Sequence, residues 1–249
     1  MNITMHRFFI SKESFAGDNV SITGQPAYQI TRVLRLKRGD RVTLLDDTGR
    51  EYETAIESIT HDTVQGKVIA NEPGIGEPKI SLTLYQALLK TDKFEFVLQK
   101  GVELGITGFI PFMSERCVVR KPSESRIERW HNIIREAAEQ SRRARLPVLY
   151  RLVSFTEACE QMNKPSLILW EGEKSRNLAV TMKSEPFHKA SALSVFVGPE
   201  GGFTPAEIEL ARRHGIVSVG LGNRILRAET AGLAAISVIM YEKGEMGQK

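Results

Sequence analysis

Two glycine-rich segments near the end of the chain combine an adaptable backbone with charged and apolar side chains. Residues 195–203 run from a buried type of strand into Gly198, Gly201 and Gly202, and residues 220–231 run from a second strand-like run into a helix. Ligands bind beyond the ends of strands in α/β proteins, and glycine lets the backbone approach a ligand closely. The two segments together predict a small-molecule site.

The second segment also indicates what kind of group this site takes. Ile225 and Leu226 fall in an expected loop, where exposed apolar surface is costly unless something covers it. A flat apolar group such as a purine ring would serve. Arg227 and Glu229 place opposite charges beside it. The competing interpretation is a pair of structural turns in which Arg227 and Glu229 only pair with each other.

Several catalytic motifs are absent from the sequence, which narrows the chemistry. The chain has no GxGxxG after a strand, no GxxxxGKS or GxxxxGKT, no HExxH and no GxSxG. These absences argue against a Rossmann dehydrogenase, a P-loop NTPase, a zinc protease and an α/β-hydrolase. The five histidines are scattered, and Cys117 and Cys159 form no CxxC, so we expect no metal site. Two isolated cysteines fit a reducing compartment.

Positive charge concentrates in two clusters, although the net charge is only +4. Residues 116–151 hold 10 Lys and Arg against 4 Asp and Glu, and a smaller basic cluster lies at residues 32–41. Most of these cations are arginines, which bind phosphate in bidentate geometry better than lysines do. Either cluster alone is compatible with a solvated helix face. The two together favour a polyanion such as a nucleic acid.

Composition places the chain among globular proteins. Of its 249 residues, 41% are hydrophobic and 26% are charged, which excludes a disordered tail and supplies a core. The longest nearly apolar stretch, residues 231–241, is shorter than the ~20 residues that a membrane-spanning helix needs. Residues 1–10 lack the apolar core of a signal peptide. We therefore expect a cytoplasmic protein without a membrane segment.

The periodic runs predict two domains. Residues 1–72 alternate short β-like runs with turns around one helix at residues 26–36, a pattern typical of a small β-barrel. Residues 71–78 contain two prolines and two glycines, which mark the boundary. In residues 73–249, strands alternate with helices, which predicts an α/β domain with a mostly parallel sheet.

The expected elements of this second domain can be given by their residues. Strands are expected at residues 80–89, 106–112, 167–170, 193–197 and 217–221. A last helix is expected at residues 229–243. The other helices are expected to begin at capping pairs, which are Asp92 with Glu95, Ser125 with Glu128, Ser154 with Glu157, and Thr204 with Glu207.

The sequence resembles the ribosomal RNA small subunit methyltransferase E family. The resemblance rests on residues 198–203 (GPEGGF) followed by residues 221–231 (LGNRILRAETA). Lys90, residues 100–106, residues 136–143 and Pro147 also match the pattern of that family, so the resemblance spans essentially the whole chain. Ala228 is a small departure, because the family commonly has threonine there.

This resemblance implies a fold and a reaction. The implied fold is an N-terminal PUA-like RNA-binding module and a C-terminal SPOUT-type α/β domain with a trefoil knot, assembled as a homodimer. The implied reaction is methyl transfer from S-adenosylmethionine to N3 of one uridine in the decoding region of 16S rRNA, within the assembled small ribosomal subunit. Two alternatives stay open: a SPOUT enzyme that modifies another rRNA or tRNA nucleotide, and a non-catalytic RNA-binding assembly factor.

The resemblance and the chemistry of the reaction also assign residues. Glu229 and Glu200 are the carboxylates that could accept the N3 proton, and Arg227 or Arg143 could stabilise negative charge on the uracil oxygens. The residues expected to line the donor site are Glu171, Gly198, Glu200, Gly201, Leu221, Gly222, Ile225 and Leu226. The cations expected to contact RNA are Arg7, Arg32, Arg35, Arg38, Lys90, Arg126, Arg129, Arg142 and Arg143.

Overall fold

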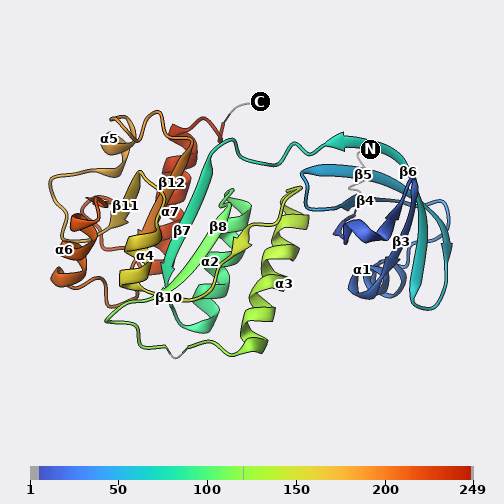
Figure 1. Cartoon of the computed structure of the whole chain (residues 1–249), viewed down its shortest axis with the longest axis horizontal. Helices are drawn as coiled ribbons and strands as arrows, with labels where there is room; N and C mark the ends of the chain where they lie inside the picture. The colour runs from blue at the N-terminus through green and yellow to red at the C-terminus, as the bar shows by residue number, and fades with distance from the viewer. Residues whose placement is uncertain (1–5, 120, 248–249) are drawn as a thin grey trace. The chain divides into compact units, whose positions relative to one another are not determined.

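A computed structural model describes residues 6–119 and 121–247 (Figure 1). Arg120 of the basic stretch, the first five residues and the last two lie outside the described part. The chain divides into two compact units, Met1–Glu77 with Ala138–Leu146, and Pro78–Ala137 with Pro147–Lys249. The boundary expected between residues 72 and 73 falls inside strand β6 (Thr63–Pro73).

The first unit is built on a curled six-stranded sheet with the strand order β1-β4-β5-β6-β3-β2. Among the described strands of this unit, β1 and β4 pair in parallel and the other pairs are antiparallel. Register shifts between β5 and β6 mark bulges, which bend the sheet around its core. The remaining elements are β1 (Arg7–Phe9), η1 (Lys12–Ser14), β2 (Phe15–Ala16), β3 (Asn19–Thr23), β4 (Arg41–Leu45) and β5 (Arg50–Ile59).

One helical segment closes the core of this unit. It consists of α1 (Gly24–Tyr28) and the π-helical turn η2 (Gln29–Val33), so the helix expected at residues 26–36 begins and ends earlier. Ala27 and Ile30 are buried against sheet residues such as Ile22 and Leu44. The arginines and the lysine of the basic cluster at residues 32–41, which begins in the last turn of this segment, are exposed.

The second unit contains a seven-stranded sheet in which every pair of the described strands is parallel. Its order is β10-β8-β7-β12-β11-β13, and β9 pairs with β8. This confirms the α/β expectation. The strands are β7 (Ser81–Ala87), β8 (Gly108–Met113), β9 (Val148–Leu149), β10 (Val153–Ser154), β11 (Ser166–Leu169), β12 (Ala192–Val197) and β13 (Val217–Val219). The helices are α2 (Thr91–Glu103), α3 (Glu124–Gln140), α4 (Phe155–Gln161), α5 (Leu178–Met182), α6 (Pro205–Arg213) and α7 (Ala228–Glu242).

Helices cover both faces of this sheet (Figure 1). Tyr85 and Phe196 stack at 4.3 Å between ring centroids and pack with Phe155 of α4, and α4 contacts α6. The next residue of β12, Val197, points to the opposite face, where it meets Gly232 of α7. Helix α7 contacts both α2 and α5. Because side chains alternate along a strand, the sheet has two apolar faces and is buried between helices.

Two of the expected capping boxes are confirmed. Ser154 with Glu157 begins α4, and Thr204 with Glu207 begins α6. The expected cap at Ser125 is wrong, because α3 begins at Glu124 and the Arg126 N–H donates to Ser123 Oγ.

The expected cap of α2 is also wrong. Lys90 is its N-cap residue and makes no side-chain capping bond. The short helix α5 had not been anticipated. Within the described residues, no helix is long and apolar enough to cross a membrane.

Candidate functional site

A cavity of about 430 Å³ lies at the carboxyl ends of β11, β12 and β13. These strands are neighbours in the parallel sheet, so the loops that follow them meet at one edge, where α/β proteins bind ligands. The structure brings the residues predicted for the donor site together around this cavity. They are Glu171, Gly198, Glu200, Gly201, Leu221, Gly222, Ile225 and Leu226.

The glycine loop after β12 approaches the neighbouring loop closely. Gly202 has a φ of +68°, a conformation that favours glycine, and a Cβ there would lie 2.6 Å from Oε1 of Glu171. Glu171 belongs to the loop after β11. Gly202 thus lets the two loops share one side of the cavity.

A buried carboxylate fixes the far end of the glycine loop. Glu207 accepts hydrogen bonds from the N–H of Thr204 at 2.9 Å, from Ser114 Oγ at 2.9 Å and from the N–H of Glu115 at 3.0 Å. Arg116 donates to the carbonyl of Gly201 at 2.8 Å. The loop after β8 therefore supports the wall of the cavity.

The loop after β11 is held by Glu173. Its carboxylate accepts hydrogen bonds from both the backbone and the hydroxyl of Ser175 and from Ser218 on β13, the last at 2.7 Å. These bonds favour the ionised form and lower the pKa of Glu173 to about 2. One ionised side chain thus ties this loop to the strand beside it.

Lys93, in the first turn of α2, joins the two carboxylates that had been singled out as proton acceptors. Its Nζ lies 3.5 Å from Oε2 of Glu229 and 3.7 Å from Oε1 of Glu200. The expected alternative, a pair between Arg227 and Glu229, is absent from the ion pairs of the described residues. Sequence reasoning missed Lys93, because an isolated lysine after a strand belongs to no motif.

Arg227 and Ile225 remain open to solvent at the cavity. The Arg227 side chain is exposed and makes no hydrogen bond or ion pair with any residue that the structure describes. Ile225 is 88% exposed, although it is apolar. Glu229 does not line the cavity itself but reaches it through Lys93. A free guanidinium and an uncovered isoleucine on one rim fit a ligand with an anionic and an apolar part.

Three predicted RNA-contacting cations of the second unit gather at one surface groove. Lys90, Arg126 and Arg129 line it together with the first turn of α2. Arg126 lies over the ring of Trp130 at 5.7 Å. Arg129 bonds to Glu95 at 2.9 Å, which raises the pKa of the guanidinium.

In the first unit, four of the predicted cations are exposed: Arg32, Arg35, Arg38 and Arg142. Two others, Arg7 and Arg143, have internal partners. Arg7 pairs with both carboxylate oxygens of Glu51 at 2.7 Å.

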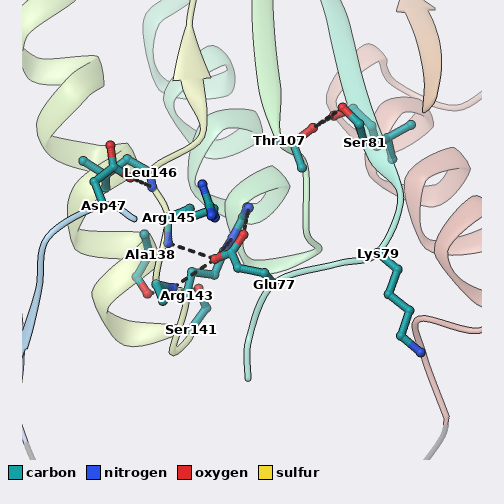
Figure 2. Close-up of polar contacts among 12 residues, drawn as sticks. Asp47, Glu77, Lys79, Ser81, Thr107, Ala138, Ser141, Arg143, Arg145 and Leu146 are labelled. Carbon is teal, nitrogen blue, oxygen red and sulfur yellow. Dashed lines mark hydrogen bonds and ion pairs between the residues drawn. The ribbon is translucent and has the colours of Figure 1, made fainter. Parts of the chain in front are cut away.

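Arg143 is only 2% exposed and pairs with Glu77 at 2.9 Å. Figure 2 shows that the carboxylate of Glu77 also accepts the N–H of Arg145. The guanidinium of Arg143 is buried and that of Arg7 is partly buried, and both are occupied by these internal pairs. The roles expected for them, Arg143 in catalysis and both in RNA contact, stay predictions that the pairs do not favour. Among the described residues, no cluster of His, Cys, Asp and Glu could hold a metal ion.

Family models match both parts of the chain. An RNA methyltransferase domain matches residues 76–240, and an RNA methyltransferase PUA domain matches residues 30–69. The expected fold class, an α/β domain with a mostly parallel sheet and a PUA module before it, is confirmed by these matches and by the structure.

Curated relatives and a solved structure point to the same family as the family models. The chain is 36% identical to the ribosomal RNA small subunit methyltransferase E of Bacillus subtilis (strain 168), covering 96% of this chain and 97% of that protein. It is 34% identical to the Synechocystis protein of the same name, covering 95% and 78%. The Neisseria gonorrhoeae enzyme of that name, solved bound to S-adenosyl methionine, matches with a TM-score of 0.86 at 31% identity over 95% of this chain and 97% of that one. The chain therefore belongs to the ribosomal RNA small subunit methyltransferase E family of RNA methyltransferases.

Proposed function

We propose that this chain methylates N3 of one uridine in the decoding region of 16S rRNA, with S-adenosylmethionine as methyl donor and the assembled small subunit as substrate. Activity as an rRNA methyltransferase follows from membership of the family. The observation that carries the proposal is the cavity at the ends of β11, β12 and β13, which has the residues of the family signature on its walls. The target atom and the assembled subunit come from the resemblance.

The residues around the cavity fit this donor. A cavity of about 430 Å³ falls in the range of small-molecule sites, roughly 300–1,000 Å³. Leu221, Ile225 and Leu226 offer apolar surface for an adenine ring. Glu171 and Glu200 offer carboxylates to a donor that carries positive charge.

When bound, S-adenosylmethionine supplies an electrophilic methyl group on a positively charged sulfur. The residues of the chain position the target base and accept the proton of its N3. Uracil N3 carries a proton and is hidden in a base pair, so the base must be unpaired or flipped. Oε2 of Glu229 is buried beside Lys93 and has no hydrogen-bond partner among the described residues; on this proposal it accepts that proton once the base is in place. Arg227 stabilises the negative charge that develops on the uracil oxygens.

The exposed cations hold the RNA backbone in place. Phosphate contacts fix register and supply much of the affinity without reading sequence. On this proposal the contacts come from the PUA module and from the groove beside α2. The residues are Arg32, Arg35, Arg38, Lys90, Arg126, Arg129 and Arg142.

A homodimer is also part of the proposal. Helix α7 buries Ile236 and Ile239 on one side, yet its other side is also apolar, with Leu233 and Val238 only half-buried and Tyr241 68% exposed. A helix that is apolar all round is buried all round in a finished assembly. A second copy of the chain would cover this side. The trefoil knot is a further expectation of the resemblance, and the cytoplasmic location stays the expectation drawn from the sequence.

Labelled S-adenosylmethionine mixed with small subunits that lack the modification tests the function. Label recovered as 3-methyluridine from one position of 16S rRNA is the expected result. Label in another nucleotide would favour the alternative of a different RNA target. No transfer, together with no donor binding by calorimetry, would favour a non-catalytic assembly factor.

A further inference from the structure

Lys93 lines the cavity but belongs to neither signature segment. Its ammonium lies between carboxylates from two different elements, Glu200 in the loop after β12 and Glu229 in the first turn of α7. The Lys93 side chain is 24% exposed, and those of Glu200 and Glu229 are 28% and 13% exposed. Partial burial makes these charges interact more strongly than they would in open solvent.

The two carboxylates depend on Lys93 to different degrees. Oε1 of Glu200 also faces the backbone N–H of Lys90 at 3.5 Å. Oε2 of Glu229 is buried and has no hydrogen-bond partner in the described chain, so Lys93 is its charge partner. Without Lys93, the carboxylates of Glu200 and Glu229 would repel each other, and Glu229 would lose the group that orients it.

The charge of Lys93 gives no obvious advantage for binding the donor. On the proposed function the sulfur of the donor is positively charged, and the ammonium of Lys93, already offset by its two carboxylate partners, does not attract it. A residue that does not strengthen donor binding can still speed the reaction through what it does once the base is in place. Its two ion pairs indicate what that contribution is.

We propose that Lys93 is a positioning residue for methyl transfer, which holds the carboxylate of Glu229 in the orientation that accepts the proton of the target base. This inference rests on the proposed function. It makes Lys93 act through Glu229, with Glu200 as the second anchor of the ammonium. Misplacement of a reacting group by about 1 Å costs roughly a hundredfold in rate.

Four variants test this role, each measured for turnover with saturating donor and small subunits and for donor affinity by calorimetry. Lys93→Met keeps the length of the stem and removes the charge, and Lys93→Arg keeps the charge. Glu229→Gln and the double variant Lys93→Met/Glu229→Gln complete a double-mutant cycle. Lys100→Met is the matched control, because Lys100 lies on the same helix and pairs with Glu103 away from the cavity.

The expected result has three parts. Lys93→Met lowers turnover roughly a hundredfold, while its donor dissociation constant stays the same or falls, because a like charge has been removed. Lys93→Arg restores most of the turnover. The double variant is no slower than Glu229→Gln alone, since the two residues act as one unit.

Other results would overturn the inference. If Lys93→Met turned over as fast as Lys100→Met, Lys93 would have no role in methyl transfer. A turnover loss accompanied by a matching loss of donor affinity would indicate a structural role. Multiplicative effects in the double variant would show that Lys93 does not act through Glu229. Failure of the wild-type chain to transfer label to small-subunit RNA is a separate outcome, which overturns the proposed function itself.

Discussion

Substitution of Gly202 by alanine tests whether the glycine loop places Glu171 at the donor site. Gly202 has a φ of +68°, and an added Cβ would lie 2.6 Å from Oε1 of Glu171. That oxygen is the free end of a flexible side chain, so Glu171 would rotate away. Gly215 is the matched position, because its φ is +79° but its Cβ would meet only the end of the Lys164 side chain, with Nζ at an ordinary 3.5 Å.

The magnitudes follow from these two environments. An alanine in the left-handed region costs roughly 1–2 kcal/mol, partly offset by the lower entropy of the unfolded chain. Gly202→Ala and Gly215→Ala should therefore both lower the free energy of unfolding by about 1 kcal/mol. Only Gly202→Ala displaces a carboxylate that faces the cavity. Loss of a contact to a charged group costs about 1.5–3 kcal/mol, which is roughly tenfold to a hundredfold in donor affinity.

Urea unfolding measures the first effect, and calorimetric titration with S-adenosylmethionine measures the second. The expected pattern is equal destabilisation of the two variants and weaker donor binding by Gly202→Ala alone. Equal donor affinity of the two variants would refute the assignment of Glu171 to the donor site. A much larger destabilisation of Gly202→Ala would show that Glu171 cannot rotate away from the added Cβ.

Arg227→Ala should change the free energy of unfolding by no more than about 0.5 kcal/mol, because the side chain is exposed. It should slow methylation of small subunits by roughly 10²–10³. A variant that turns over as fast as the wild type would show that Arg227 has no role in the reaction. Replacing Arg35 and Arg38 by glutamine should flatten the salt dependence of RNA affinity by about 0.7–0.9 logarithmic units per lost phosphate contact, whereas Arg41→Gln, whose side chain already pairs with Glu53 at 2.8 Å, should change it less. An unchanged salt dependence of RNA affinity would show that Arg35 and Arg38 are solvated surface residues without phosphate contacts. Glu173→Gln should weaken the pH dependence of stability below pH 4.5, because the pKa of Glu173 falls from 4.5 to about 2 on folding and its stabilisation is lost as pH drops through that window. Urea midpoints of wild type and variant that decline in parallel from pH 4.5 to 2 would contradict this.

Much of the fold of the second unit could be predicted from local pattern. Alternating strands and helices indicate a parallel sheet, and the capping boxes at Ser154 and Thr204 mark where α4 and α6 begin. These signals are local, because a capping bond joins residues three positions apart. The predicted caps of α2 and α3 failed for a related reason: several polar residues near each helix start can serve, and packing selects among them.

The predicted site divides in the same way. The glycine loop and the segment at residues 220–231 are visible in sequence, since their residue types are unusual together. Arg7 and Arg143 carry the same charge as Arg38, yet they pair inside their unit with Glu51 and Glu77, whereas Arg38 is exposed. Residue type does not reveal which cations find such partners.

What the sequence by itself determined is therefore the class of fold, the family and the two segments that line the cavity. Only the tertiary structure decided that Lys93 stands between Glu200 and Glu229, because three residues far apart in the chain meet where β7 and β12 lie side by side and α7 packs against α2. Electrostatic interaction depends on the distance between the charges and on their burial, and neither can be read from the sequence alone.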